Sequence, residues 1–212
     1  VKRNNRTAEA RRPEPRSVYI RNKIIAENLA FGLVCKVGAR FPSAAPRIGK
    51  LVGGGVQARD LVDKSYKIFA SPRWVRFYEM EYGIPREALP EALGRVRALV
   101  GGLAEPIFFP IEVRVSAGDD IPLSTASGRD SAWIAAHVHK GGSYETYFQG
   151  IEKIMNDYDG RPHWGKLHFQ DHTTLAPRYP EWDAFQEVRA ELDPDERFAN
   201  AYTDRVLGPV GG

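Results

Sequence analysis

The sequence has little cysteine, no long hydrophobic run and no strong excess of charge of either sign. Its single cysteine, Cys35, excludes an internal disulfide and is typical of a reducing compartment. Cys35 stands in an apolar run, which indicates a buried, unreactive thiol. No apolar stretch is long enough to cross a membrane and no signal-peptide pattern is present. We therefore expect a cytoplasmic protein, with peripheral membrane contact left open.

The charges nearly balance, with 30 basic and 27 acidic residues and a formal net charge of +3. The excess is concentrated in the first fifty residues, where arginines dominate, and such a segment could bind an anionic partner. Beyond this segment basic and acidic residues are interspersed, so we predict no nucleic-acid partner. The 212 residues, 42% of them hydrophobic, are enough to bury a sizeable core.

Alternating hydrophobic periodicities predict a β-α-β-β-α order in the middle of the chain. The expected strands are 73–84, 107–116 and 131–140, with helices at 86–100 and 143–158 and a further strand near Lys166. Pro85 stops the first strand, and Gly101 and Gly102 end the first of these helices. This order resembles a ferredoxin-like unit, so the predicted fold class is α+β: a mixed, mainly antiparallel sheet with flanking helices.

Two further regions flank this unit. Residues 1–16 read as a polar strap, followed by a helix from 17 to 37 that we expect Gly38 to end. The tail contains an amphipathic helix that ends at Asp193-Pro194. The predicted division is 1–70 for the strap and first helices, 71–170 for the α/β domain and 171–212 for a C-terminal helical segment.

The predicted strand at residues 111–115 has two different faces. Side chains alternate along a strand, so Ile111, Val113 and Val115 share a face that we expect to enter the core. Glu112 and Arg114 share the opposite face. A Glu-x-Arg pair alone is usually an ordinary salt bridge on a solvated sheet face.

The next strand gives that pair more weight. His137 and His139 lie on one face of residues 133–139, and pairing of the two strands would bring them to the face of Glu112 and Arg114. The histidines could instead bind zinc or copper together with His163, His168 and His172. Because no cysteine or carboxylate stands at a familiar ligand spacing, we predict no metal site.

Four segments form a specific combination. These are Arg76–Tyr82, Phe109–Arg114, Arg161–Lys166 and the ending from Tyr179 to Gly208. The combination resembles the aldonolactone oxidases, which oxidise L-gulono-, L-galactono- or D-arabinono-1,4-lactone. It also resembles their relatives, the alditol oxidases, and both belong to the vanillyl-alcohol-oxidase type of flavoproteins.

The resemblance implies that this chain is the cap, or substrate domain, of such a flavoenzyme. In that family a separate N-terminal domain binds FAD, and a C-terminal segment returns to it. The resemblance therefore places the FAD-binding half of the same protein upstream of Val1 and implies that the present chain alone is inactive. Covalent or non-covalent attachment of FAD, and O2, a cytochrome or a quinone as electron acceptor, stay open.

Individual residues match the family's functional positions. Glu112 and Arg114 match the pair that meets the sugar beside the flavin, and Lys166 matches the lysine near the flavin ring. His163 looks like the histidine that contacts the cofactor, and His137 like one that lines the substrate pocket. The resemblance then implies that Glu112 orients or deprotonates a sugar hydroxyl, Arg114 stabilises the alkoxide and Lys166 stabilises the reduced flavin anion.

Alternative functions stay open from the sequence. His139, a second substrate-binding candidate, stands where alditol oxidases have a hydroxyl residue, which favours a sugar lactone over a linear polyol. An alditol oxidase is the nearer alternative. A stand-alone α/β module that binds an anionic ligand or a metal is the more distant one.

Overall fold

A computed structural model describes residues 6–41, 60–70, 72–105 and 107–210. These residues divide into two compact units, 1–77 and 78–212, which are considered separately.

The first unit contains one continuous helical run. It begins as α1 (Arg16–Tyr19), continues with π-type hydrogen bonding as η1 (Ile20–Ala30) and ends as α2 (Phe31–Arg40). The helix was predicted, but the predicted end at Gly38 was wrong, since the run continues to Arg40. A glycine inside a helix costs only a modest amount of stability, so it need not end the helix. Cys35 is buried as predicted, and burial raises the pKa of its thiol to about 11. A short helix, α4 (Ser65–Phe69), follows.

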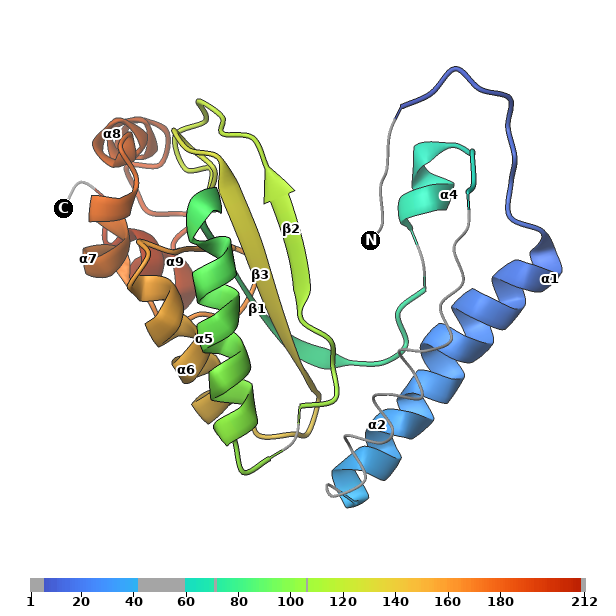
Figure 1. The fold of residues 1–212 in the computed structure, drawn as a ribbon. Helices are drawn as coiled ribbons and strands as arrows, with labels where there is room; N and C mark the ends of the chain where they lie inside the picture. The colour runs from blue at the N-terminus through green and yellow to red at the C-terminus, as the bar shows by residue number, and fades with distance from the viewer. Residues whose placement is uncertain (1–5, 42–59, 71, 106, 211–212) are drawn as a thin grey trace. The chain divides into compact units, whose positions relative to one another are not determined.

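The second unit is a four-stranded sheet with helices on one face (Figure 1). Its strands are β1 (Phe77–Pro85), β2 (Glu112–Ser116), β3 (Ser131–His139) and β4 (Arg161–Pro162), in the spatial order β2-β3-β1-β4. The turn η3 (Arg86–Ala88) and helix α5 (Leu89–Gly102) follow β1, and α6 (Glu145–Asn156) follows β3. This order is that of a ferredoxin-like unit and confirms the predicted α+β class.

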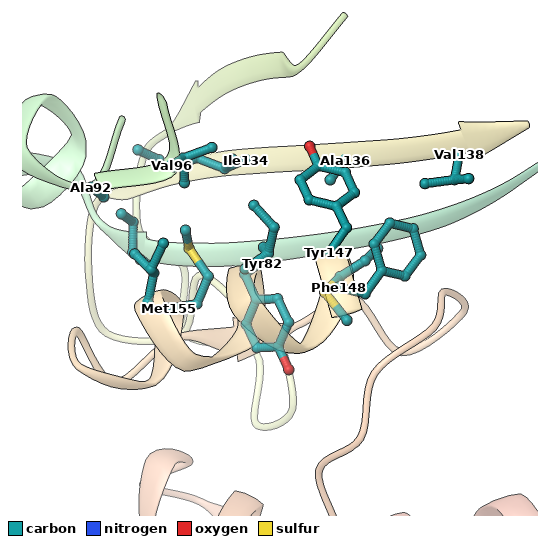
Figure 2. Packing of buried hydrophobic residues seen from close by; sticks show 14 residues of the cluster. Tyr82, Ala92, Val96, Ile134, Ala136, Val138, Tyr147, Phe148 and Met155 are labelled. Carbon is teal, nitrogen blue, oxygen red and sulfur yellow. The ribbon is translucent and has the colours of Figure 1, made fainter. Parts of the chain in front are cut away.

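The core lies between the sheet and these two helices (Figure 2). Alternate residues of β1 and β3 turn toward the helices, and α6 contributes the largest side chains facing them. The fully buried members include Met80, Tyr82, Ile84, Ala132, Ile134, Phe148, Ile151 and Met155. Because successive side chains of a strand point to opposite faces, the intervening residues of β1 and β3 lie on the sheet face away from these helices.

β2 differs from the prediction. It starts at Glu112 rather than 107, after Pro110, which has no N–H to donate to a strand ladder. Val113 and Val115 were expected in the core, but they are 41% and 54% exposed. β2 is an edge strand, and none of its residues, all of which the structure describes, belongs to the buried cluster. Ile111, just before the strand, does pack against that cluster.

Two strand limits in the prediction also shift. β1 begins at residue 77 instead of 73, because the N–H of Trp74 donates to the Asn28 side chain at 2.7 Å rather than to a ladder. The last strand is β4, four residues before Lys166.

The chain beyond β4 stays beside β1. The N–H of His163 donates to the carbonyl of Glu81 at 2.9 Å, and the N–H of Leu167 donates to the carbonyl of Glu79 at 2.9 Å. Since Tyr82 pairs with Pro162, regular pairing would place residue 165 opposite Glu79, so residues between 163 and 167 bulge. This bulge contains Lys166.

The C-terminal part forms four short helical elements. They are α7 (His172–Leu175), η4 (Ala176–Arg178), α8 (Trp182–Leu192) and α9 (Ala201–Leu207). α8 is the predicted amphipathic helix, and it ends immediately before Asp193 as expected. These elements pack around a second buried cluster of Leu175, Tyr179, Trp182 and Val206.

Candidate active site

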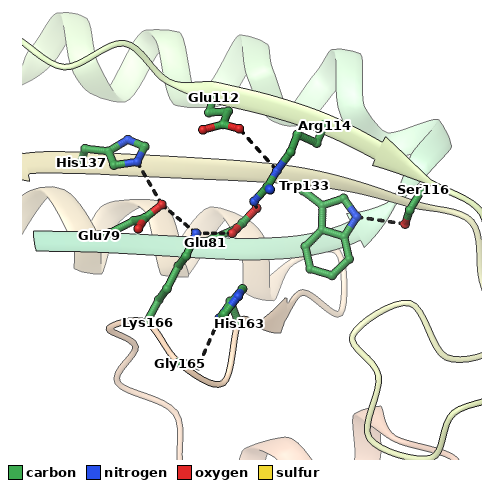
Figure 3. Close-up of polar contacts among 10 residues, drawn as sticks. All are labelled: Glu79, Glu81, Glu112, Arg114, Ser116, Trp133, His137, His163, Gly165 and Lys166. Atoms are coloured by element: carbon green, nitrogen blue, oxygen red, sulfur yellow. Dashed lines mark hydrogen bonds and ion pairs between the residues drawn. The ribbon is translucent and has the colours of Figure 1, made fainter. Parts of the chain in front are cut away.

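The sheet face opposite α5 and α6 carries a group of charged side chains (Figure 3). β2 and β3 pair antiparallel, with Glu112 opposite Ala135 and Arg114 opposite Trp133. This pairing confirms that Glu112, Arg114 and His137 share one face. We call Glu79, Glu81, Glu112, Arg114, His137 and Lys166 together the polar cluster.

Glu81 of β1 lies at the centre of the polar cluster. Its side chain has no solvent exposure and receives hydrogen bonds from both Arg114 and Lys166, one on each carboxylate oxygen. A buried carboxylate is stable only when charged or polar partners replace its lost water. Glu81 therefore holds together two cations that come from β2 and from the bulge after β4.

Glu79 is the second anchor of Lys166. The Lys166 Nζ lies 2.6 Å from Glu79 Oε1, and the Lys166 side chain is only 16% exposed. Two of the three ammonium hydrogens thus point to carboxylates. In the part of the chain that the structure describes, no third acceptor for this ammonium is found.

Glu79 also fixes His137. Burial opposes ionisation of Glu79, but hydrogen bonds from His137 and Lys166 outweigh it and lower the pKa of Glu79 to about 2. The ionised carboxylate can only accept, so His137 Nε2, 3.0 Å from Glu79 Oε1, must carry the hydrogen. The imidazole also stacks on the ring of Phe109, with centroids 5.8 Å apart.

The outer edge of the polar cluster is accessible. Glu112 and Arg114 each have 52% of their side chains exposed, and Arg114 Nε lies 3.6 Å from Glu112 Oε1. Burial lowers the pKa of Arg114, but the contacts with Glu81 and the other carboxylates prevail and raise it. The guanidinium is therefore a permanent cation next to an accessible carboxylate.

Trp133 borders the polar cluster on the side of Ser116. Its indole N–H donates to Ser116 Oγ at 3.0 Å. The ring lies over Gly83, where an added Cβ would stand 3.5 Å from the ring carbons.

His163 lies next to the polar cluster without an ion pair to it. The N–H of Gly165 donates to His163 Nδ1 at 3.0 Å, so the neutral ring carries its hydrogen on Nε2. His163 is an exposed residue, and this N–H is available to a ligand.

The other histidines are not brought into the polar cluster. His139, at the end of β3, makes no hydrogen bond or ion pair with it among the described residues. His168 is buried elsewhere, with Nε2 3.1 Å from the Tyr202 hydroxyl. Within the described ranges no three His, Cys, Asp or Glu side chains are grouped as a metal ion would need.

Sequence reasoning missed Glu79 and Glu81 as site residues. The signal was present, because they alternate with Met80 and Tyr82 in a predicted strand. Two carboxylates two residues apart must share the polar face of such a strand. The residues that pair with Glu79 and Glu81 lie 33 to 87 positions away in the sequence, so the pattern could not predict them.

Comparison with known sequences shows the family of this chain. The sequence model of the D-arabinono-1,4-lactone oxidase family matches residues 1–206. The chain belongs to this family. Membership in the D-arabinono-1,4-lactone oxidase family confirms the resemblance deduced from the sequence motifs.

Relatives of this family member include proteins with several activities. The chain is 55% identical to the L-gulono-1,4-lactone dehydrogenase of Mycobacterium tuberculosis over 183 residues, which are 86% of this chain and 43% of the relative. It is 32% identical to the L-gulonolactone oxidase of Mus musculus, covering 68% of this chain and 34% of the relative. An alditol oxidase from a Streptomyces species is 32% identical over 61% of this chain and 31% of its own length.

The chain thus spans less than half the length of these curated relatives. No helix in the described ranges has the length and hydrophobicity needed to span a membrane.

Proposed function

We propose that this chain forms the substrate-binding face of an FAD-dependent oxidoreductase that oxidises the CH–OH group of a sugar 1,4-lactone, such as L-gulono- or D-arabinono-1,4-lactone. The observation that carries the proposal is the polar cluster. It joins an accessible carboxylate, a permanent guanidinium and a largely enclosed ammonium on a sheet face that the helices leave open. Family membership supports the same chemistry.

The donors on this face fit a flavin as the cofactor. Lys166 has one ammonium hydrogen without a partner among the described residues, and His163 has an exposed Nε2–H. Such donors suit the oxygens and nitrogens of a flavin, and we assign these two residues to its binding. When bound, FAD would accept the hydride from the carbon that carries the hydroxyl.

The residues of this chain supply the remaining chemistry. Oxidation of an alcohol releases a proton from oxygen, and in this proposal the exposed carboxylate of Glu112 orients the hydroxyl and accepts that proton. Arg114 stabilises the negative charge that develops on the same oxygen. Lys166 supplies positive charge to the cofactor, and His137, with Nε2 tied to Glu79, contributes to the wall of the substrate site together with His139.

The rest of the protein is the proposed partner of this face. The relatives are more than twice as long as the matched region, which leaves room for an FAD-binding half in the same protein. The electron acceptor and the mode of FAD attachment would then depend on residues outside the present chain.

Anaerobic addition of L-gulono-1,4-lactone to the full-length protein tests this function. Bleaching of the visible flavin band would support lactone oxidation. A flavin band unchanged by this lactone and by D-arabinono-1,4-lactone, but bleached by xylitol, would instead support an alditol oxidase. Absence of any flavin from the purified full-length protein would overturn the proposal.

A further inference from the structure

The two carboxylates beneath the polar cluster have no role in the mechanism above, although they make most of its contacts. Glu81 is completely enclosed and meets both cations. Glu79 meets Lys166 and His137 and is 24% exposed. Neither carboxylate is accessible enough to be the base that Glu112 provides. Their position behind the cations suggests an electrostatic role.

The charges of the polar cluster do not leave a surplus of positive charge. His137 apart, Arg114 and Lys166 face Glu79, Glu81 and Glu112, so three carboxylates oppose two cations. Each cation is attached to an enclosed carboxylate on its inner side. Both can still donate hydrogen bonds to a hydroxyl or carbonyl oxygen, because hydrogen-bond donation does not require a net positive charge.

A sugar lactone and its hydrolysis product differ in charge. Opening of the lactone ring by water gives an aldonate, in which the ester carbonyl has become a carboxylate and the former ring oxygen a further hydroxyl group. Next to a face with excess negative charge, that carboxylate would be repelled, while the neutral lactone would not.

Resting on the proposed function, we infer that Glu79 and Glu81 are specificity-determining residues that make this site select a neutral lactone over the corresponding aldonate. They do so by cancelling the charges of Lys166 and Arg114 from the protein side. Glu81 also positions these two cations relative to each other, since it binds one with each oxygen.

The test compares the dissociation constants of L-gulono-1,4-lactone and sodium L-gulonate in the full-length flavoprotein. The lactone constant is obtained from the concentration dependence of anaerobic flavin reduction, and the gulonate constant from isothermal titration calorimetry. We expect the wild-type protein to prefer the lactone. Glu81→Gln should tighten gulonate binding on the order of 10- to 100-fold and change lactone binding much less.

Glu152→Gln is the matched control. Glu152 is also a buried carboxylate, but it accepts from Tyr82 and from a backbone N–H and forms no ion pair with any residue that the structure describes. This variant should keep the wild-type ratio of the two constants. A general loosening of the fold would change both variants alike, whereas a charge effect changes only Glu81→Gln.

Two results would overturn the inference: equal affinity of the wild-type protein for both forms, or an unchanged ratio in Glu81→Gln. If Glu81→Gln does not fold, the partly exposed Glu79→Gln replaces it, with the same outcomes. Failure of the proposed function is a separate result, because the wild-type flavin would then not bleach with any lactone.

Discussion

The ammonium of Lys166 is hydrogen-bonded to the enclosed carboxylate of Glu81, 85 residues earlier in the chain. This contact joins the bulge after β4 to the central part of β1. It places the cation on the same face as Arg114, so that charged residues from three separate segments lie together on one sheet face.

Replacement of Glu112 by Gln in the full-length protein should slow flavin reduction by the lactone by about 10²- to 10⁴-fold. The amide retains the shape of the side chain but cannot accept the hydroxyl proton. Anaerobic stopped-flow absorbance measures this rate. Glu87→Gln, which removes an exposed carboxylate beyond β1, is the control. A near-normal rate in Glu112→Gln would remove this residue from the mechanism.

The hydrogen bond between Tyr82 and Glu152 should stabilise the α/β unit. The Tyr82 hydroxyl lies 2.5 Å from Glu152 Oε2, and both side chains are buried. Tyr82→Phe removes one of the two hydrogen bonds that this buried carboxylate oxygen accepts and should lower the free energy of unfolding by about 1–3 kcal/mol. Urea unfolding of Tyr82→Phe, Glu152→Gln and the double mutant should give a coupling free energy of about 0.5–3 kcal/mol between the two residues. Strict additivity of the two changes would contradict this account.

His168 should make the protein sensitive to mild acid. Burial, with a smaller contribution from Arg205, lowers the pKa of His168 from 6.5 to about 4. Between these values the unfolded chain binds a proton that the folded protein does not, so stability falls as pH falls from 6.5 to 4. The expected loss is about 1–3 kcal/mol. His168→Gln keeps a donor for Tyr202 but cannot titrate, and its urea midpoint should vary less over this range; an equal variation would argue against the prediction.

Two glycine-to-alanine changes should have opposite effects on stability. Gly94 lies on the exposed side of α5 with no atom near an added Cβ, so Gly94→Ala should stabilise by about 0.5–1 kcal/mol. At Gly160 an added Cβ would stand 2.6 Å from the Met155 carbonyl oxygen, which forces the backbone to move. Gly160→Ala should therefore destabilise by about 1–3 kcal/mol. Thermal unfolding of both variants checks the two signs. A change of the unfolding midpoint in the same direction for both would contradict the prediction.

The sequence predicted much of the α/β unit because its signals are local. Side-chain alternation located β1 and β3, helical spacing located α5 and α6, and the alternation within β2 placed Glu112 and Arg114 on one face. The combination of four segments, one of them ending at Lys166, indicated the family, and the family match confirmed it.

Local patterns failed where a residue's environment depends on distant parts of the chain. An Ile-x-Val-x-Val pattern reads the same on a central strand and on an edge strand. The exposure of Val113 and Val115 was therefore decided by the position of β2 outside the strands that the helices cover.

The sequence by itself determined the order of strands and helices, the face shared by Glu112, Arg114 and His137, and the family. Only the tertiary structure decided that Glu79 and Glu81 lie beneath Arg114 and Lys166. The physical reason is that side-chain direction follows from backbone geometry within a few residues. Pairing of charges, in contrast, requires the sheet to bring β1, β2 and the bulge after β4 within hydrogen-bond distance.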